Sequence, residues 1–328
     1  MTANHLTAEA HGHLAEYNRR MNRVLDHIDR NLDGKLDLAL LADVAHFSRF
    51  HFHRLFVAWM GETVGDYAQR RRLETAAMRL SCTRVSVLEI ALSTGFGSGE
   101  ALAHAFKRKY GLSPSAWRTG AESRRQQALA QWRAGRQSYG SNPDQLVRKP
   151  DQVTMAGIDD HMPSLQPESE MHMDVIMTTL PRVRVAYHRY IGCYGPQVNA
   201  YWREVVAPWI GAHGLDDPIC YGIGRDDPAV TPADKCRYDA CVTVPETFLP
   251  GGQTGVYDLP GGRYAVARFK GDALALGDAW MQLMREWLPA SGLQCDERPV
   301  FERFTPSSGQ DPVTGEFCCE LCLPVRPL

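Results

Sequence analysis

The chain has 328 residues, of which 44% are hydrophobic and 23% charged, as is ordinary for a globular protein of two or three domains. No apolar run approaches the roughly 20 residues that a membrane-spanning helix needs, so the sequence excludes such a helix and predicts no membrane partner. Nine cysteines without regular spacing favour a reducing cytosol over a disulfide framework, and the first residues lack the pattern of a signal peptide. We therefore expect a cytoplasmic protein.

The net charge of −2 is unevenly divided along the chain. Residues 1–137 contain 20 Lys and Arg against 13 Asp and Glu, together with 8 of the 12 histidines. The remaining residues contain 16 Lys and Arg against 25 Asp and Glu. A basic half suits a polyanionic partner, and an acidic half suits cations or simply solubility.

The N-terminal part is predicted to be helical, with a loose tail around His5, His11 and His13. A short helix, a tight turn and a longer helix follow one another twice, which is the helix-turn-helix arrangement. Between the two units lies a long helix with the run Arg70-Arg71-Arg72, which is either a solvated face or a binding site. The predicted helices are residues 14–32, 38–45, 48–60, 63–80, 87–93 and 98–110.

The two units correspond residue by residue. Phe47 matches Phe96 at a spacing of 49, and after one inserted residue Gly61 matches Gly111 at a spacing of 50. Matched positions are helix caps, turns or apolar core positions. The sequence therefore predicts a duplicated fold.

The second unit, IALSTGFGSGEALAHAFKRKYGLSPSAWR, is close to the signature of the AraC-type transcription regulators, at its G-F-x-S turn and its G-x-S-P-x-x-W/Y-R ending. Residues 15–120 resemble the DNA-binding region of that family. The resemblance implies that the two longer helices enter successive major grooves of double-stranded promoter DNA. It also implies RNA polymerase as a partner.

The outward faces of the two longer helices supply the predicted DNA-binding residues. In the first helix Arg54 suits a guanine, His53 a base edge or phosphate, and Phe50 a thymine methyl, unless Phe50 and His53 are buried against another helix. In the second helix small residues replace long polar ones, so we expect it mainly to contact phosphates through Lys107 and Arg108. The full set is Arg49, Phe50, His53, Arg54, Ser98, Glu100, His104, Lys107 and Arg108.

Residues 119–137 are predicted to form a further helix. Residues 139–171, rich in Pro, Ser, Gly and Asp, are predicted to be a linker with a short strand at 153–158. The predicted division is a DNA-binding domain at 1–120, a helix and linker at 121–170, and an effector-binding domain at 171–328.

A second duplication follows the linker. Residues 180–192 align with 259–271, and residues 236–245 with 315–324, both at a spacing of 79. Each repeat is predicted as strand, helix, strand, strand, which gives an α+β domain with pseudo-symmetry. This repeat, RPVFERF (298–304) and FCCELCLPV (317–325) resemble the gyrase-inhibitor-like (GyrI-like) domain, the effector-binding module of AraC-type regulators with this architecture.

Glu302 is the central candidate for a ligand site, because it lies in a strand with Val300 and Phe304 on its own face. A carboxylate among apolar residues is costly unless it meets a cation or hydrogen bonds. The resemblance implies that this glutamate lies at the base of an aromatic cleft that receives cationic, lipophilic ligands, with Glu320 as a second acid. The alternative for Glu302 is a salt bridge with Arg303 or Arg268. The aromatic candidates, each of which could instead be a core residue, are Tyr187, Trp209, Tyr221, Tyr264, Trp287 and Phe304.

Two alternatives concern other classes of function. Some GyrI-like proteins hydrolyse strained genotoxic molecules with paired glutamates, but the attached DNA-binding half favours sensing over catalysis. Cys318, Cys319 and Cys322 could serve a redox or metal sensor, although a Cys-x-x-Cys pair within a strand suits zinc poorly. The sequence thus predicts a ligand-responsive transcription regulator with no catalytic residues, cofactor or metal.

Overall fold

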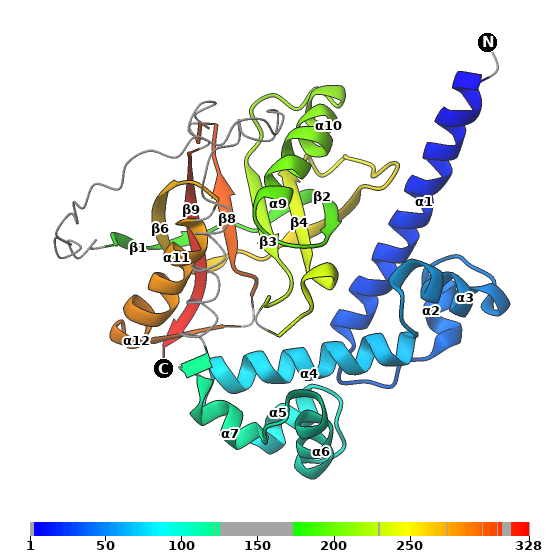
Figure 1. Cartoon of the computed structure of the whole chain (residues 1–328). Helices are drawn as coiled ribbons and strands as arrows, with labels where there is room; N and C mark the ends of the chain where they lie inside the picture. Colours follow the sequence, from blue (N-terminus) through cyan, green and yellow to red (C-terminus); the bar gives the residue numbers. More distant parts are fainter. Residues whose placement is uncertain are drawn as a thin grey trace, which may run out of the picture.

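The computed structural model describes residues 3–121, 123–124, 173–228, 230–273, 275–296, 298–306, 308–309 and 316–327. The predicted linker and its strand lie outside these residues, as does most of the predicted helix at 119–137. A helical N-terminal half lies against a C-terminal half built on a curled antiparallel sheet, which confirms the predicted fold class (Figure 1). Among the helices described, none is both long and apolar enough to cross a membrane.

The N-terminal half contains the two predicted helix-turn-helix units. The predicted tail is wrong, because the backbone is helical from Ala3, in a stretch that contains no proline and continues without a break into the apolar stripe of α1. The helices are α1 (Ala3–Arg30), α2 (Leu38–Val44), α3 (Arg49–Met60), α4 (Val64–Cys82), α5 (Val87–Ser93), α6 (Gly99–Tyr110) and α7 (Pro114–Thr119).

Helix ends repeat between the two units, as the duplication predicts. Gly61 and Gly111 end α3 and α6 with φ of 67° and 74°, a left-handed conformation that glycine adopts without steric cost. Asp37 caps α2 and Ser86 caps α5, each accepting a hydrogen bond from a backbone N–H of the first turn. These four helix ends are therefore set locally by the sequence.

Helix α4 joins the cores of the two units. Its first half places Tyr67 against Phe56 in the first core, and its second half places Leu73 in the core that contains Phe106. The Trp117 indole of α7 donates a hydrogen bond to the carbonyl oxygen of Ala77 at 3.2 Å. Because both cores share this helix, the two units are held at a fixed separation.

The C-terminal sheet is pseudo-symmetric. Its strand order is β1-β6-β9-β8-β3-β4-β2-β5, and β7 pairs with β9 off this path. The order reads the same from either end when β1, β2, β3 and β4 are matched with β5, β6, β8 and β9. The strands are β1 (Val175–Leu180), β2 (Val183–Ile191), β3 (Cys220–Gly224), β4 (Arg237–Thr243), β5 (Gly255–Leu259), β6 (Gly262–Gly271), β7 (Leu293–Cys295), β8 (Phe301–Phe304) and β9 (Phe317–Pro327).

Among the described residues, the first repeat carries one strand more than the sequence predicts (β1), and the second carries two more (β5 and β7). The extra strands β1 and β5 pair with β6 and β2 of the other repeat, so each repeat lends its first strand to its partner. Helical segments cover one face of the sheet, and α1 reaches the other face at β2 and β5. These segments are α9 (Pro196–Tyr201), η2 (Trp202–Val206) and α10 (Ala207–Ala212) in the first repeat, and α11 (Ala275–Gln282), η4 (Leu283–Trp287) and α12 (Leu288–Ala290) in the second.

Candidate functional site

Glu302 lies on the helix-covered face of the sheet, and its side chain is enclosed by aromatic residues. The residue is 9% exposed. The Trp280 indole of α11 donates a hydrogen bond to Oε1 of Glu302 at 2.7 Å, and the Tyr238 hydroxyl of β4 forms a further hydrogen bond with the carboxylate. The Trp202 indole of the first repeat donates in turn to the Tyr238 hydroxyl at 3.2 Å. One indole N–H therefore reaches the carboxylate directly, and the other reaches it through the Tyr238 hydroxyl.

The pseudo-twofold axis passes through the pair formed by Gly222 of β3 and Glu302 of β8, which lie opposite each other at the centre of the sheet. A Cβ on Gly222 would lie 2.5 Å from Oε2 of Glu302 and would overlap the hydroxyl of Tyr238. Glycine is thus the one residue that leaves this space open. The symmetry of the fold is broken here, since one repeat supplies the carboxylate and the other supplies room for it.

Burial raises the pKa of Glu302 to about 7, although the hydrogen bonds from Trp280 and Tyr238 oppose the shift. A salt bridge with Arg303 does not form, because Arg303 points to the opposite face and pairs with Glu320 there. The carboxylate has no cationic partner among the described residues. It can therefore change charge near neutral pH, and it can attract a cation when ionised.

The other predicted ligand residues divide between the two faces, because successive strand residues alternate. Phe304 shares the face of Glu302 and lies 6.1 Å from the Trp202 ring, measured between ring centroids. Trp209 packs on His188 and Phe248. Three aromatic candidates are core residues of the opposite face: Tyr187, Tyr221 and Tyr264. Trp287 packs in the core beside α11.

Glu320 is not a second acid of the same cleft. It lies opposite Arg303 in the pairing of β8 with β9, so its side chain occupies the face away from Glu302. The paired glutamates that a hydrolase would need are not brought together.

The sequence analysis did not identify Trp202, Tyr238 and Trp280 as residues around Glu302. The matched helices of the two repeats could have indicated both tryptophans.

Most of the predicted DNA-binding side chains that the structure describes are exposed on α3 and α6. His53 and Arg54 are exposed on α3, so His53 is not buried against another helix, while the side chains of Arg49 and Phe50 lie outside the description. On α6, four predicted residues are exposed: Glu100, His104, Lys107 and Arg108. Ser98 caps this helix by accepting a hydrogen bond from the N–H of Ala101 at 3.2 Å.

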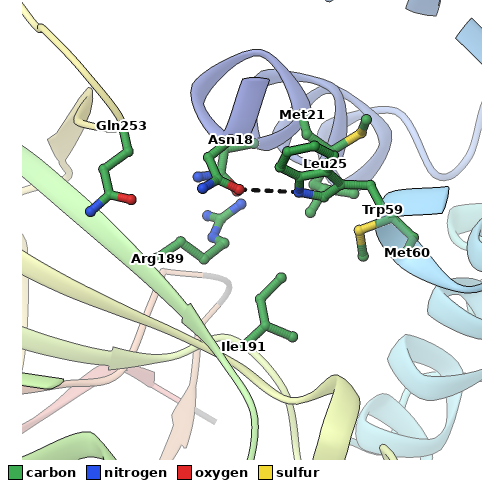
Figure 2. A pocket seen from close by; sticks show the side chains of 9 residues that line it. Asn18, Met21, Leu25, Trp59, Met60, Arg189, Ile191 and Gln253 are labelled. Carbon is green, nitrogen blue, oxygen red and sulfur yellow. Dashed lines mark hydrogen bonds between the residues drawn. The ribbon is translucent and has the colours of Figure 1, made fainter. Parts of the chain in front are cut away.

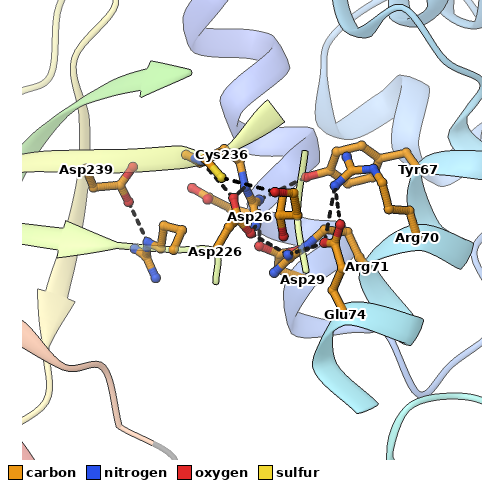
Figure 3. A network of polar contacts seen from close by, with 12 residues as sticks. Asp26, Asp29, Tyr67, Arg70, Arg71, Glu74, Asp226, Cys236 and Asp239 are labelled. Atoms are coloured by element: carbon orange, nitrogen blue, oxygen red, sulfur yellow. Dashed lines mark hydrogen bonds and ion pairs between the residues drawn. The ribbon is translucent and has the colours of Figure 1, made fainter. Parts of the chain in front are cut away.

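A buried network of charges joins the N-terminal half to the C-terminal half (Figure 3). Arg71 of α4 pairs with Asp226, and Arg237 of β4 pairs with Asp29 of α1 at 2.7 Å. The solvated face considered for Arg70 and Arg71 is therefore wrong, because both side chains are buried and paired with carboxylates. Among the described residues, four cations balance four carboxylates: Arg70, Arg71, Lys235 and Arg237 with Asp29, Glu62, Glu74 and Asp226.

The arginines of this network hold Asp29 and Asp226 ionised. Burial alone would raise the pKa of Asp29, but the charges of Arg237 and Arg71 outweigh burial and keep that pKa well below its usual range. The hydrogen bond and charge of Arg237 lower the pKa of Asp226 in the same way, again against the effect of burial. The junction between the halves is thus made of fully charged, compensated groups.

A second ion cluster lies beside the first. Arg189 of β2 pairs with Asp26 of α1 at 2.8 Å and with Asp239 of β4 at 2.6 Å. The hydroxyl of Tyr187 also donates to Oδ2 of Asp26 at 2.7 Å. Tyr187 therefore belongs to the contact between the halves, and its position explains why it does not face Glu302.

Four cysteines are buried thiols, Cys236, Cys241, Cys319 and Cys322, whereas Cys82 and Cys193 are exposed. Burial raises the pKa of Cys236 and of Cys322 to about 12, which keeps both protonated near neutral pH. In the part of the chain that the structure describes, no three His, Cys, Asp or Glu side chains are grouped as metal ligands would be.

Comparison with known proteins agrees with this architecture. Residues 41–120 match the family described as "Helix-turn-helix domain", and residues 164–326 match the "GyrI-like small molecule binding domain". The chain belongs to the AraC-type helix-turn-helix regulators that carry a C-terminal GyrI-like effector-binding domain. It is thus a DNA-binding transcription regulator with a small-molecule-binding domain.

Relatives match the whole chain or one half of it. The transcriptional regulator Rob of Salmonella typhimurium is 24% identical over 309 residues, which cover 91% of this chain and 95% of Rob. YgiV of Escherichia coli is 38% identical over 145 residues, covering 42% of this chain and 87% of YgiV. The crystal structure of the AdpA DNA-binding domain with a target DNA is 33% identical, with a TM-score of 0.29, over 32% of this chain and 94% of that one. The homologues are transcriptional regulators, not enzymes.

Proposed function

We propose that the C-terminal half senses a small lipophilic cation, in the manner of a multidrug sensor. The observation that carries the proposal is the Glu302 carboxylate, which is buried, bonded to Trp280 and Tyr238, and without a cationic partner among the described residues. An ionised carboxylate in such a place is costly, and a cationic ligand would offset this cost. The rings of Trp202, Trp280 and Phe304 would add cation–π attraction and apolar contact.

The N-terminal half would read promoter DNA with unequal units. The first unit would recognise bases through α3, which carries the exposed His53 and Arg54. The second would mainly hold phosphates through Lys107 and Arg108 of α6, since its remaining outward residues are short or acidic. We assign residues 1–120 to DNA binding, 121–170 to the connection and 171–328 to effector binding, and we expect the regulator to act on RNA polymerase in the cytoplasm.

Strand β4 would couple the two functions. Tyr238 faces Glu302, whereas its neighbours Arg237 and Asp239 point to the other face, into the ion clusters that hold α1 and α4. The hydroxyl of Tyr194 also donates a hydrogen bond to the backbone carbonyl oxygen of Arg237 at 2.5 Å. A ligand that moves Tyr238 would therefore act on the strand that fixes the DNA-binding half. Coupling requires that the ligand prefer one arrangement of the halves, because equal affinity for both shifts nothing.

Calorimetric titration of the full chain with tetraphenylphosphonium tests the proposed ligand class. We expect saturable binding to the unmodified protein, at least tenfold weaker binding to Glu302→Gln, and unchanged binding to Glu320→Gln, whose carboxylate lies on the other face. Triphenylphosphine oxide, a neutral molecule of similar shape, should bind more weakly than the cation. Equal affinities of the unmodified protein and Glu302→Gln would contradict the proposal.

A further inference from the structure

A cleft of about 220 Å³ lies at the junction of the two halves, on the face of the sheet opposite to Glu302 (Figure 2). The N-terminal half contributes one wall through α1 and the last turn of α3, and β2 contributes the other. The nine lining residues are Asn18, Met21, Asn22, Leu25, Trp59, Met60, Arg189, Ile191 and Gln253.

The polar part of the lining consists mainly of carboxamides. Asn18 accepts a hydrogen bond from the Trp59 indole at 3.1 Å, and its own N–H groups bond to no other described residue. The side chains of Asn22 and Gln253 are half-buried and make no hydrogen bond with another described residue. A carboxamide can both donate and accept, so these three groups suit a ligand that presents donors and acceptors of the same kind.

The charge of the cleft is already compensated. Among the described residues that line the cleft, Arg189 is the one with a cationic side chain. This side chain is 1% exposed and pairs with Asp26 and Asp239. An anionic ligand would have to compete with these two carboxylates, and a cationic ligand would meet the guanidinium. The electrostatics therefore favour a neutral ligand.

The apolar part of the lining is preformed. The Trp59 ring stacks on Tyr17, with ring centroids 5.9 Å apart and planes within 17°, and it is also held by Asn18. Met21, Leu25 and Met60 complete an apolar wall beside it (Figure 2). A flat indole and two flexible thioethers suit a planar molecule, because thioethers adapt their shape to an aromatic ring.

We propose that this junction cleft is a second ligand site, which takes a neutral, planar heteroaromatic molecule with amide-like donors and acceptors. Such a ligand would contact α1 and α3 of the DNA-binding half and β2 of the effector half at the same time. It would therefore stabilise the arrangement in which the halves are docked. Neither Glu302 nor DNA is needed for this binding, so it stands apart from the cation site.

Calorimetry with quinazolinone, a neutral bicyclic ring with one amide, tests the site on the full chain. Ile191→Trp should fill the cleft from a position that is 40% exposed, where a larger side chain is tolerated, and should weaken binding by about tenfold or more. Gln253→Leu, at a half-buried loop position, should weaken binding by about fivefold through the loss of one hydrogen-bonding group. Thermal unfolding checks that both variants fold.

Glu302→Gln is the matched control, because it alters the cation site and leaves the junction cleft unchanged. We expect it to bind quinazolinone with the affinity of the unmodified chain. The proposal is overturned by an absence of saturable binding to the unmodified chain, by equal binding to folded Ile191→Trp, or by loss of binding in Glu302→Gln, which would place the probe in the other cleft.

Discussion

Arg237 and Tyr238 are consecutive residues of β4 whose side chains point to opposite faces of the sheet, the first to Asp29 of α1 and the second to Glu302. One strand thus connects the buried carboxylate with the ion network between the halves. Because neighbouring strand residues alternate, a displacement of one side chain acts on the other through only one peptide unit.

Gly222→Ala should close the space around the carboxylate without straining the backbone. The added Cβ would lie 2.5 Å from Oε2 of Glu302 and would overlap the Tyr238 hydroxyl, so both groups must move. We expect a loss of stability of about 1–3 kcal/mol, typical of overpacking, and at least tenfold weaker binding of tetraphenylphosphonium. Urea unfolding and calorimetry measure the two effects.

Gly211→Ala is the matched control for that substitution. A Cβ at Gly211 meets no atom within 4 Å, and the residue is exposed in α10, where alanine is the better helix former. It should leave cation binding unchanged. Weakening of cation binding by both substitutions to the same extent would show that the space at Gly222 has no special role.

The affinity for a lipophilic cation should rise by about tenfold from pH 6 to pH 8. The pKa of Glu302 in the folded chain is about 7, above its usual 4.5, so the carboxyl is mostly protonated at pH 6 and mostly ionised at pH 8. Only the ionised form attracts a cation. Calorimetry at the two pH values measures the change, and a pH-independent affinity would exclude Glu302 as the counter-ion.

The same pKa shift has an opposite consequence for the stability of the unliganded chain. Between pH 4.5 and 7 the folded state keeps a proton that the unfolded state loses, so this contribution to stability falls as the pH rises through that window. The loss is about 3 kcal/mol by pH 8. Glu302→Gln cannot ionise, and its urea unfolding free energy should lack this decline.

The local features of the fold could be predicted from the sequence, because they depend on near neighbours. Gly61 and Gly111 end helices through their own backbone freedom, and the spacing of 50 between them indicated two copies of one unit. Glu302 could likewise be singled out, since Val300 and Phe304 lie within two residues of it. Helix caps and strand alternation need no knowledge of the distant chain.

The pairing of distant segments could not be predicted. Alternation within β9 predicts that Glu320 and Cys318 share one face of the sheet. Only the pairing of Arg303 with Glu320 shows that this face is the one opposite to Glu302. Arg71 resembled a surface residue because its partner Asp226 lies 155 residues away. The local sequence around a charged residue does not indicate an ion-pair partner that is distant in the chain and becomes a neighbour only in the folded structure.

Arg237→Leu should destabilise the chain by about 3–5 kcal/mol, because it leaves Asp29 and Asp226 buried without their main cation. Arg203→Leu, which breaks an exposed ion pair with Glu204, should cost at most about 1 kcal/mol. Urea unfolding of the full chain gives both values. Similar losses from the two substitutions would mean that the junction is as weakly coupled as an ordinary surface pair.

A double substitution separates two causes of the destabilisation by Arg237→Leu: the loss of the ion pair itself and the cost of leaving a buried carboxylate unpaired. If Arg237→Leu is harmful because carboxylates are left unpaired, adding Asp226→Leu should restore part of the stability, since a buried ion pair can be replaced by apolar groups at little cost. A double variant less stable than Arg237→Leu alone would instead show that Asp226 stabilises the junction by other bonds, such as the one it accepts from the N–H of Arg237.

Arg54→Ala and Lys107→Ala should weaken DNA binding in different ways. Both side chains are exposed, Arg54 on α3 and Lys107 on α6. If α3 reads bases, selection from a random duplex pool with Arg54→Ala should relax the preference at one base position, at a cost of about 1–3 kcal/mol. If α6 holds phosphates, Lys107→Ala should weaken binding to all sequences equally and reduce the slope of log affinity against log salt by about one.

Ala58→Ser is the control, since Ala58 is exposed on α3 and lies outside the predicted DNA-binding set. It should change neither the selected sequences nor the salt dependence. Identical selected sequences for Arg54→Ala and Lys107→Ala would rule out the unequal roles of the two units. In that case α3 and α6 would contribute to recognition alike, and the small residues on α6 would need another explanation, such as closer approach of its backbone to the groove.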